Sequence, residues 1–214
     1  MSKALKVTHI VGARPNFVKA APLVKALEAK GVEQSLIHTG QHYDEIMSDA
    51  FFRDLNMPTP DFNLHVGGGT QFDQLSKLML GLPDALTALS PDALILYGDV
   101  NSTMVASIVA NRLDIPVIHV EAGLRSGDMR MPEESNRKIV DMFAELHLTT
   151  SPEALDNLVN EGASASSVHE IGNTMIDSLF ASQHLFDFER VQAKLGVPEK
   201  FGVVTMHRGG NVDD

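Results

Sequence analysis

Short apolar runs recur along the whole chain and predict the strands of a sheet. The predicted strands cover residues 6–11, 35–38, 93–97, 117–120, 146–149 and 168–171. Most of these runs are apolar at consecutive positions, with no alternation between apolar and polar residues. Such strands are typical of a parallel sheet that is covered by helices on both faces.

Amphipathic segments separate these runs and predict helices. In the first, Phe17, Ala20 and Val24 lie on one helical face, and Pro22 is expected to kink the helix or to mark where its regular part begins. Thr70 and Asp73 resemble a capping box at the start of another. That helix is expected to bury the following residues: Leu75, Leu78, Met79, Leu82, Leu86 and Leu89. Further helices are expected over 44–55, from Asn101, from Glu133, after Ser151 and from Thr174.

The alternation of strands and helices predicts an α/β fold, a Rossmann-like parallel sheet that occupies residues 1–181. Residues 182–200 are expected to form a helical connector, and 202–206 (GVVTM) a new strand. A strand with nothing after it cannot bury both of its faces. Residues 182–214 are therefore expected to be the connector and first strand of a second domain that is cut off near its beginning.

Composition and charge exclude several classes of function. The net charge of −11 repels phosphate backbones, so a nucleic-acid partner is not expected. The chain has no cysteine, which excludes disulfides and thiolate metal sites. No apolar run is long enough to span a membrane, and the apolar N-terminal run is expected to be a strand, not a signal peptide. A soluble cytoplasmic protein is expected.

The candidate chemistry lies at the ends of the predicted strands, where ligands bind in open α/β sheets. Glu121 directly follows a buried strand and precedes Ala122 and Gly123, whose small size allows a ligand to approach. The alternative for Glu121 is a buried ion pair with Arg125. Asp99 also follows a strand, and its alternative is a turn or cap residue before the next helix.

Two other groups of residues have competing interpretations. Glu133 and Glu134 stand in the first turn of a helix, where the helix dipole favours carboxylates, so a purely structural role explains one of them. Arg14 and Lys19 follow Gly12 and either hold a phosphate at the helix N-terminus or belong to an ordinary turn. The spacing matches neither a P-loop nor a dinucleotide fingerprint, and it leaves both interpretations open.

Zinc and serine-nucleophile motifs do not fit the sequence. His38 and His42 have the spacing of a metal-binding pair, but the glutamate of that motif is missing. His119 and Glu121 match the first part of a zinc-deaminase signature whose cysteines do not exist here. The G-x-S-x-G pattern is also absent. No metal or redox cofactor is expected.

One family accounts for all these positions together, because the sequence resembles the non-hydrolysing UDP-N-acetylglucosamine 2-epimerases. The matching motifs are GARPNFVKAAPL (12–23), HTGQHYD (38–44), GGGT (67–70), YGDVNST (97–103), HVEAGLRSGDMRMPEESNR (119–137), IGNTMIDSL (171–179) and VVTMHRGGNVDD (203–214). The resemblance implies two Rossmann-like domains in a glycosyltransferase-B-like architecture, with the active site between them. These residues would form the N-terminal half.

The resemblance also implies a reaction, the inversion of C2 of UDP-GlcNAc to give UDP-ManNAc through elimination and re-addition of UDP. One group must remove a proton from one face of the sugar and another must return it to the opposite face. The implied acid–base residues are Asp99, Glu121 and Glu133, and His207 would assist the leaving group. The implied substrate-binding residues are Arg14, Lys19, Gln41, His42, Arg125 and Arg208.

Two departures from the family pattern matter. Gly209 and Gly210 stand where the family usually has a glutamate before Asn211, so a polar contact near the leaving group is lost. The resemblance implies that a second domain supplies much of the uridine and diphosphate pocket, and most of that domain is expected to lie outside these 214 residues. Weak or no epimerase activity is therefore expected for these residues alone, because their carboxylates would sit in water without the raised pKa values that the chemistry needs.

Several alternatives to this function stay open. The GDVNST and RMPEE forms also resemble the branch that acts on UDP-2,3-diacetamido-2,3-dideoxyglucuronate, whose anionic sugar would need a cation such as Arg125 or Arg130. A hydrolysing epimerase and a non-catalytic nucleotide-sugar-binding module are further alternatives. Glu121 and Glu133 argue against a glycosyltransferase. The resemblance also implies a homodimer and a product that feeds cell-surface polysaccharide synthesis.

Overall fold

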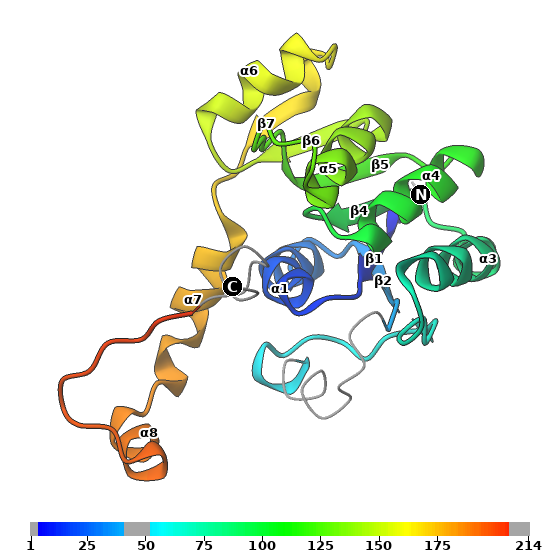
Figure 1. The fold of residues 1–214 in the computed structure, drawn as a ribbon. Helices are drawn as coiled ribbons and strands as arrows, with labels where there is room; N and C mark the ends of the chain where they lie inside the picture. The colour runs from blue at the N-terminus through cyan, green and yellow to red at the C-terminus, as the bar shows by residue number, and fades with distance from the viewer. Residues whose placement is uncertain (1–3, 41–51, 206–214) are drawn as a thin grey trace. The chain divides into compact units, whose positions relative to one another are not determined.

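The computed structural model describes residues 4–40 and 52–205, and these form two compact units, Met1–Ala181 and Ser182–Asp214. The described part of the first unit contains a seven-stranded sheet in the order β3-β2-β1-β4-β5-β6-β7 (Figure 1). All neighbouring strands are parallel, as the register Lys6↔Glu33 and Val11↔His38 illustrates for β1 and β2. The predicted α/β class with a parallel sheet is confirmed.

The strands closely follow the apolar runs of the sequence. Their bounds are β1 Lys6–Val11, β2 Glu33–His38, β3 Phe62–Asn63, β4 Ala93–Tyr97, β5 Val117–Ala122, β6 Leu146–Thr149 and β7 Val168–Glu170. The two-residue β3 was not predicted, because it is too short to give a pattern. Strand β5 extends two residues beyond the predicted end, so Glu121 belongs to the strand itself.

The helices also match the amphipathic segments. Their bounds are α1 Arg14–Glu28, α3 Gln71–Leu89, α4 Asn101–Arg112, α5 Pro132–Phe143, α6 Pro152–Asn160 and α7 Thr174–Ser182. Of the helix expected over 44–55, only the part from residue 52 is described, and 52–54 are helical. Thr70 and Asp73 form the predicted reciprocal cap of α3. Met79 was expected in the core but is largely exposed.

Helices cover both faces of the sheet (Figure 1), and a separate apolar core lies on each face. On one face α3, α4 and α5 pack against side chains such as Ile10, Leu94 and Leu96. On the other face α1 packs Phe17 and its neighbours against residues such as Val11 and Tyr97. This explains why the strands are apolar at consecutive positions: each face of the sheet has its own core.

The second unit is small, and its helix α8 runs over Phe188–Leu195. The predicted strand over 202–206 is wrong for residues 202–205, which are irregular, and Met206 lies outside the described residues. No described segment pairs with these residues, and an isolated strand leaves its backbone polar groups without partners. Over the described ranges, no helix is both long and apolar enough to cross a bilayer.

Candidate functional site

The carboxyl ends of β1, β4 and β5 meet at the point where the sheet reverses its strand order. The chain passes from β1 to β2 and β3 on one side, then crosses to β4 and continues through β5, β6 and β7 on the other. Ligands of open α/β sheets bind at such a switch point. Tyr97 pairs with Val120, and the Gly98 N–H donates to the Val120 carbonyl at 3.0 Å. Asp99 and Glu121 therefore leave neighbouring strands at the same edge.

Glu121 forms an ion pair with Lys19 of α1, with 2.7 Å between Oε2 and Nζ. The Lys19 side chain is 8% exposed and that of Glu121 is 21% exposed. Lys19 reaches Glu121 over Gly98: a Cβ at Gly98 would lie 2.8 Å from the Lys19 Nζ. The ion pair with Arg125 that was the alternative for Glu121 is therefore not formed. Glu121 also has a positive φ of 71°, and such strain concentrates at functional sites.

Asp99 forms an ion pair with Arg137 of α5, with 2.6 Å between Oδ2 and Nη2. The main-chain oxygen of Asp99 also accepts from the Asn136 side chain at 2.8 Å. The N-cap residue of α4 is Val100, so the Asp99 carboxylate does not cap that helix. Burial opposes the charge of Arg137, but the carboxylates of Asp99 and Glu134 outweigh it and raise its pKa. Asp99 thus faces a permanent cation.

Glu133 and Glu134 have opposite environments although they are adjacent. The Glu134 side chain is 1% exposed and accepts from the backbone N–H groups of Ser126 and Gly127, from the Ser126 hydroxyl and from Arg137. Burial favours its neutral form, but these donors prevail and lower its pKa to about 2. Glu134 therefore holds the loop before α5, which is the structural role expected for one of the two glutamates.

Glu133 is exposed and lines a small depression together with Asp99. The depression has a volume of about 200 Å³ and is lined by Gln71, Asp99, Val100, Asn101, Pro132, Glu133 and Asn136. Among the described residues, no ion-pair partner lies near Glu133. The structure thus brings Glu133 and Asp99 together at one opening, and the carboxylate of Glu133 is directed to solvent-accessible space.

The turn between β1 and α1 is held by Asn16. Its side-chain oxygen accepts from the N–H groups of Gly12 at 3.2 Å and Ala13 at 3.0 Å, and its amide donates to the Tyr97 carbonyl at 2.9 Å. Arg14 is exposed at the first position of α1. The Gly12 and Ala13 N–H groups that would cradle a phosphate are thus engaged by Asn16. A role of Arg14 and Lys19 at a phosphate stays a prediction.

Behind these turns, a buried network is centred on Asp141 near the end of α5. Its Oδ1 meets the His119 Nδ1 at 2.6 Å, and its Oδ2 accepts from the Gly123 N–H at 3.1 Å and from Arg125 at 2.8 Å. Burial raises the Asp141 pKa, but His119 and Arg125 outweigh it, so the net shift is downward. Arg125 also contacts Glu161. The guanidinium of Arg125 is therefore engaged within the protein, and its predicted role as a substrate ligand is untested.

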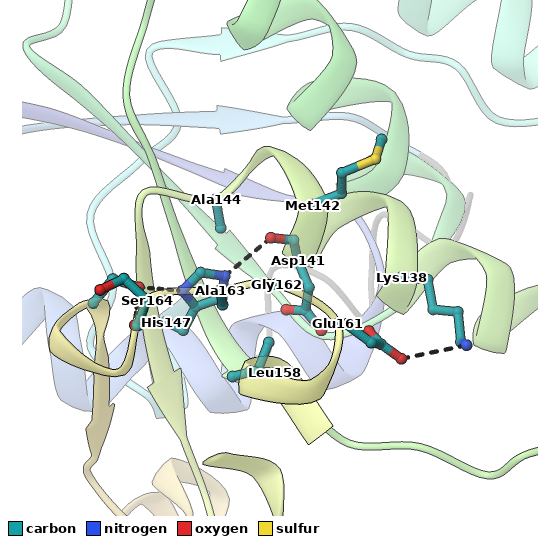
Figure 2. Close-up of a pocket in the computed structure, with 11 residues that line it drawn as sticks. Lys138, Asp141, Met142, Ala144, His147, Leu158, Glu161, Gly162, Ala163 and Ser164 are labelled. Carbon is teal, nitrogen blue, oxygen red and sulfur yellow. Dashed lines mark hydrogen bonds and ion pairs between the residues drawn. The ribbon is translucent and has the colours of Figure 1, made fainter. Parts of the chain in front are cut away.

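A larger hollow of about 620 Å³ lies at the ends of α5 and α6 (Figure 2). Its lining comprises Lys138, Asp141, Met142, Ala144, His147, Leu158, Glu161, Gly162, Ala163, Ser164 and Ser167. Lys138 and Glu161 pair at 3.3 Å, and the His147 Nε2 lies 3.0 Å from the Asp141 carbonyl, as Figure 2 shows. None of the predicted site residues that the structure describes lines this hollow. The larger hollow is formed by segments that lead into β6 and β7, so it lies toward the amino ends of these strands. Ligands of open α/β sheets bind at the carboxyl ends of the strands, and we therefore place the candidate site at the smaller depression.

The structure tests the location of the predicted site residues only in part. It places Asp99, Glu121 and Lys19 at one sheet edge and Glu133 at the adjoining depression, whereas Gln41, His42, His207 and Arg208 lie outside the described residues. The sequence did not point to Arg137, Asn136 or Asp141, whereas Asn16 stands among the polar residues at the predicted strand ends. A signal existed for Arg137, which stands four residues after Glu133 and three after Glu134, where helical neighbours meet.

Comparison with known proteins links this geometry to one family. A family model described as UDP-N-acetylglucosamine 2-epimerase matches residues 25–214. The chain is 37% identical, over 98% of its length, to a Pseudomonas aeruginosa protein named UDP-2,3-diacetamido-2,3-dideoxy-D-glucuronate 2-epimerase. It is 36% identical, also over 98%, to a Methanocaldococcus jannaschii UDP-N-acetylglucosamine 2-epimerase. It spans 59% and 58% of these two relatives, respectively.

Solved structures show the same likeness. A crystal structure of the Methanocaldococcus jannaschii UDP-GlcNAc 2-epimerase in complex with UDP-GlcNAc and UDP matches 98% of this chain with a TM-score of 0.91 and 35% identity, and the match covers 59% of that protein. The lipopolysaccharide outer core galactosyltransferase WaaB matches 79% of this chain and 46% of its own with a TM-score of 0.58. At 15% identity, the second likeness concerns the fold alone.

Proposed function

The chain belongs to the UDP-N-acetylglucosamine 2-epimerase family, and from that premise we propose that it supplies the acid–base carboxylates of an enzyme that interconverts UDP-GlcNAc and UDP-ManNAc. One observation carries the proposal: two strand-end carboxylates, Glu121 and Asp99, each face their own cation beside the open Glu133. The chain spans about three fifths of its relatives, so the proposal concerns the activity of the whole protein.

The reaction needs a base, a leaving group and an acid in sequence. A base removes the proton at C2, the C–H electron pair forms the C1=C2 bond, and UDP departs with the electron pair of the C1–O bond. The intermediate is 2-acetamidoglucal. UDP then adds back at C1 while a proton is delivered to the opposite face of C2, so that atoms and charges balance and only the configuration at C2 changes.

The charges of the site suit these steps. Lys19 pairs with Glu121 and Arg137 pairs with Asp99, so each strand-end carboxylate has a cation beside it. Glu133 is exposed at the depression and forms no ion pair with any described residue. We propose that the three carboxylates share the acid–base work, and that His207, which lies outside the described residues, assists the departing UDP.

Exchange at C2 tests the proposal directly. The full-length protein, incubated with UDP-GlcNAc in D₂O, should form UDP-ManNAc and incorporate deuterium at C2, as followed by ¹H NMR. The Glu121→Gln variant should lose both signals. Retention of C2 exchange in Glu121→Gln, or absence of exchange in the unaltered full-length protein, would contradict the proposal. The 214 residues alone are expected to show weak or no turnover.

The cations near the site are relevant to which nucleotide sugar is the substrate. The named function of the Pseudomonas relative makes UDP-2,3-diacetamido-2,3-dideoxyglucuronate a second candidate substrate. An anionic sugar needs an available cation. Arg125 is already engaged by Asp141 and Glu161, whereas Arg130 is 90% exposed and its surface pair with Asp128 leaves it able to bind an anion. A comparison of kcat/KM for both nucleotide sugars decides between them, and free UDP that rises in step with product would indicate a hydrolysing enzyme instead.

A homodimer is part of the proposal, as is a cytoplasmic role in supplying cell-surface polysaccharide synthesis. Helix α3 presents Phe72, Met79 and Leu80 to solvent, with Phe72 78% exposed and Leu80 77% exposed. Exposed apolar patches of this kind favour association. Analytical ultracentrifugation of the unaltered protein and of Leu80→Glu tests the dimer. A monomer at micromolar concentration for the unaltered protein would contradict it.

A further inference from the structure

His119 occupies an unusual position beneath the candidate site. It lies on β5, its side chain is fully buried, and both of its ring nitrogens have a partner. Nδ1 lies 2.6 Å from the Asp141 carboxylate, and Nε2 lies 2.9 Å from the Gly98 carbonyl. A carbonyl oxygen can only accept a hydrogen bond, so Nε2 carries a proton.

The Asp141 carboxylate is also an acceptor in this network. It already accepts from the Gly123 N–H and from the Arg125 guanidinium, and both groups bind the ionised form. The downward shift of its pKa agrees with this state. The His119 Nδ1 therefore also faces an acceptor. Both ring nitrogens of His119 thus lie against acceptors, at a position with no exposure to water.

The two partners of His119 lead to the two turns of the candidate site. Gly98 directly precedes Asp99, and Gly123 stands two residues after Glu121. His119 thus binds the first turn through the Gly98 carbonyl, and it binds the second through Asp141, which holds the Gly123 N–H. Charge-assisted bonds of this kind are shorter and stronger than neutral ones and suit a fixed spacing.

We propose that the buried imidazolium of His119, together with Asp141 and Arg125, is a positioning unit that fixes the spacing between the turn of Asp99 and the turn of Glu121. His119 touches no substrate in this role; it acts through the two turns. The proposal adds a residue to the acid–base site and, for its kinetic consequences, rests on the proposed function. A misplacement of about 1 Å at a reacting group can cost on the order of 100-fold in rate, so such a unit affects turnover.

The charged groups around His119 come from three elements. Helix α5 contributes Asp141, the segment after β5 contributes Arg125, and Glu161 at the end of α6 reaches the network through Arg125. Strand β6 contributes His147, which pairs with His119 in the sheet register. Its Nε2 donates to the main-chain oxygen of Asp141, and its Nδ1 lies 3.3 Å from the Ser167 hydroxyl, so its ring nitrogens contact neither turn. His147 is therefore a matched control: equally buried and adjacent, but not connected to the candidate carboxylates through the turns.

The first test needs no turnover and no variant. ¹⁵N NMR of the ring nitrogens, with selective histidine labelling, should show both His119 nitrogens protonated at pH 7. An unprotonated Nδ1 or Nε2 would overturn the proposal. Because this measurement is made on the unaltered protein, it decides the charge state even if the proposed epimerase activity is wrong.

The second test compares His119→Gln with His147→Gln in the full-length epimerase. A neutral glutamine at 119 cannot donate charge-assisted hydrogen bonds to both the Asp141 carboxylate and the Gly98 carbonyl. We therefore expect kcat to fall at least about 10-fold, while KM changes less than about twofold. His147→Gln should keep kcat within about twofold, with a comparable loss in Tm. Equal losses of kcat in the two variants, or unchanged kcat in His119→Gln, would show that His119 only supports the fold.

Discussion

The two ends of α5 carry carboxylates in opposite situations. At its start, Glu133 is exposed, lines a small depression with Asp99 and has no ion-pair partner among the described residues. Near its end, Asp141 is buried, and its carboxylate is bound by His119, the Gly123 N–H and Arg125. One carboxylate is accessible and chemically available, whereas the other is enclosed and saturated by donors.

The proposed function places the site at the smaller of the two hollows. The larger hollow lies at the end of α5, and its charges neutralise one another, as Lys138 and Glu161 do. The smaller depression is lined by Glu133, which has no ion-pair partner among the described residues. Four measurements test the contrast between these two carboxylates.

The largest expected effect is on turnover. Glu133→Gln removes a group that can exchange a proton, and we expect kcat for UDP-GlcNAc epimerisation to fall by about 10²–10⁴-fold. Glu161→Gln changes a residue at the end of α6 that lines the larger hollow, and it should leave kcat within about threefold. NMR of the sugar products measures both variants in the full-length protein. If Glu161→Gln were the more damaging change, the assignment of the site to the start of α5 would be wrong.

The second effect is on stability and concerns the end of the helix. Asp141→Asn leaves His119 and Arg125 buried without their anion, and breaking a buried pair in this way costs about 3–5 kcal/mol. Glu133→Gln should change the free energy of unfolding by less than about 0.5 kcal/mol, because the side chain is exposed. Urea unfolding measures both. Similar losses in the two variants would remove the contrast between the helix ends.

The third effect concerns the backbone that reaches Asp141. Gly123 has a φ of 78°, and a Cβ there would lie 2.6 Å from the Ala154 carbonyl oxygen. Gly123→Ala should therefore cost about 3 kcal/mol through strain and displacement. Gly127 has a similar φ of 73° but open space around it, so Gly127→Ala should cost only about 1 kcal/mol. Thermal unfolding measures the loss of stability in both variants. Equal losses would show that the positive φ alone, and not the close contact with Ala154, sets the cost of the added Cβ.

The smallest effect is a pH dependence at the start of α5. The pKa of Glu134 lies at about 2, below its usual 4.5, so the folded state favours the ionised form. Its contribution is complete above the unfolded-state pKa and is lost as the pH falls from about 4.5 through 2. We expect on the order of 2 kcal/mol to be lost in this window.

Glu134→Gln should flatten the stability between pH 5 and pH 2, whereas Glu133→Gln should keep the slope of the unaltered protein. Urea unfolding over this pH range makes the comparison. An unchanged slope in Glu134→Gln would place the acid sensitivity in other carboxylates.

Much of the fold was predictable because its signals are local. Apolar runs such as ALILY (93–97) mark buried parallel strands, and a Thr70–Asp73 cap is visible from a spacing of three residues. The strand predicted over 202–206 failed over its described residues because a strand depends on a neighbour, not only on its own residues. Glu121 was singled out correctly as a strand-end carboxylate, but its partner was not.

The α/β class, the order of the elements and the set of strand-end polar residues follow from local sequence patterns, since each depends on neighbours along the chain. Which charged groups pair was visible only in the folded chain: Lys19 with Glu121, Arg137 with Asp99, and His119 with Asp141. Ion pairs form where different elements pack together, and that packing depends on the whole sheet. The different environments of Glu133 and Glu134 also depend on tertiary packing. The Glu134 carboxylate accepts hydrogen bonds from the loop at Ser126 and Gly127, whereas Glu133 is exposed.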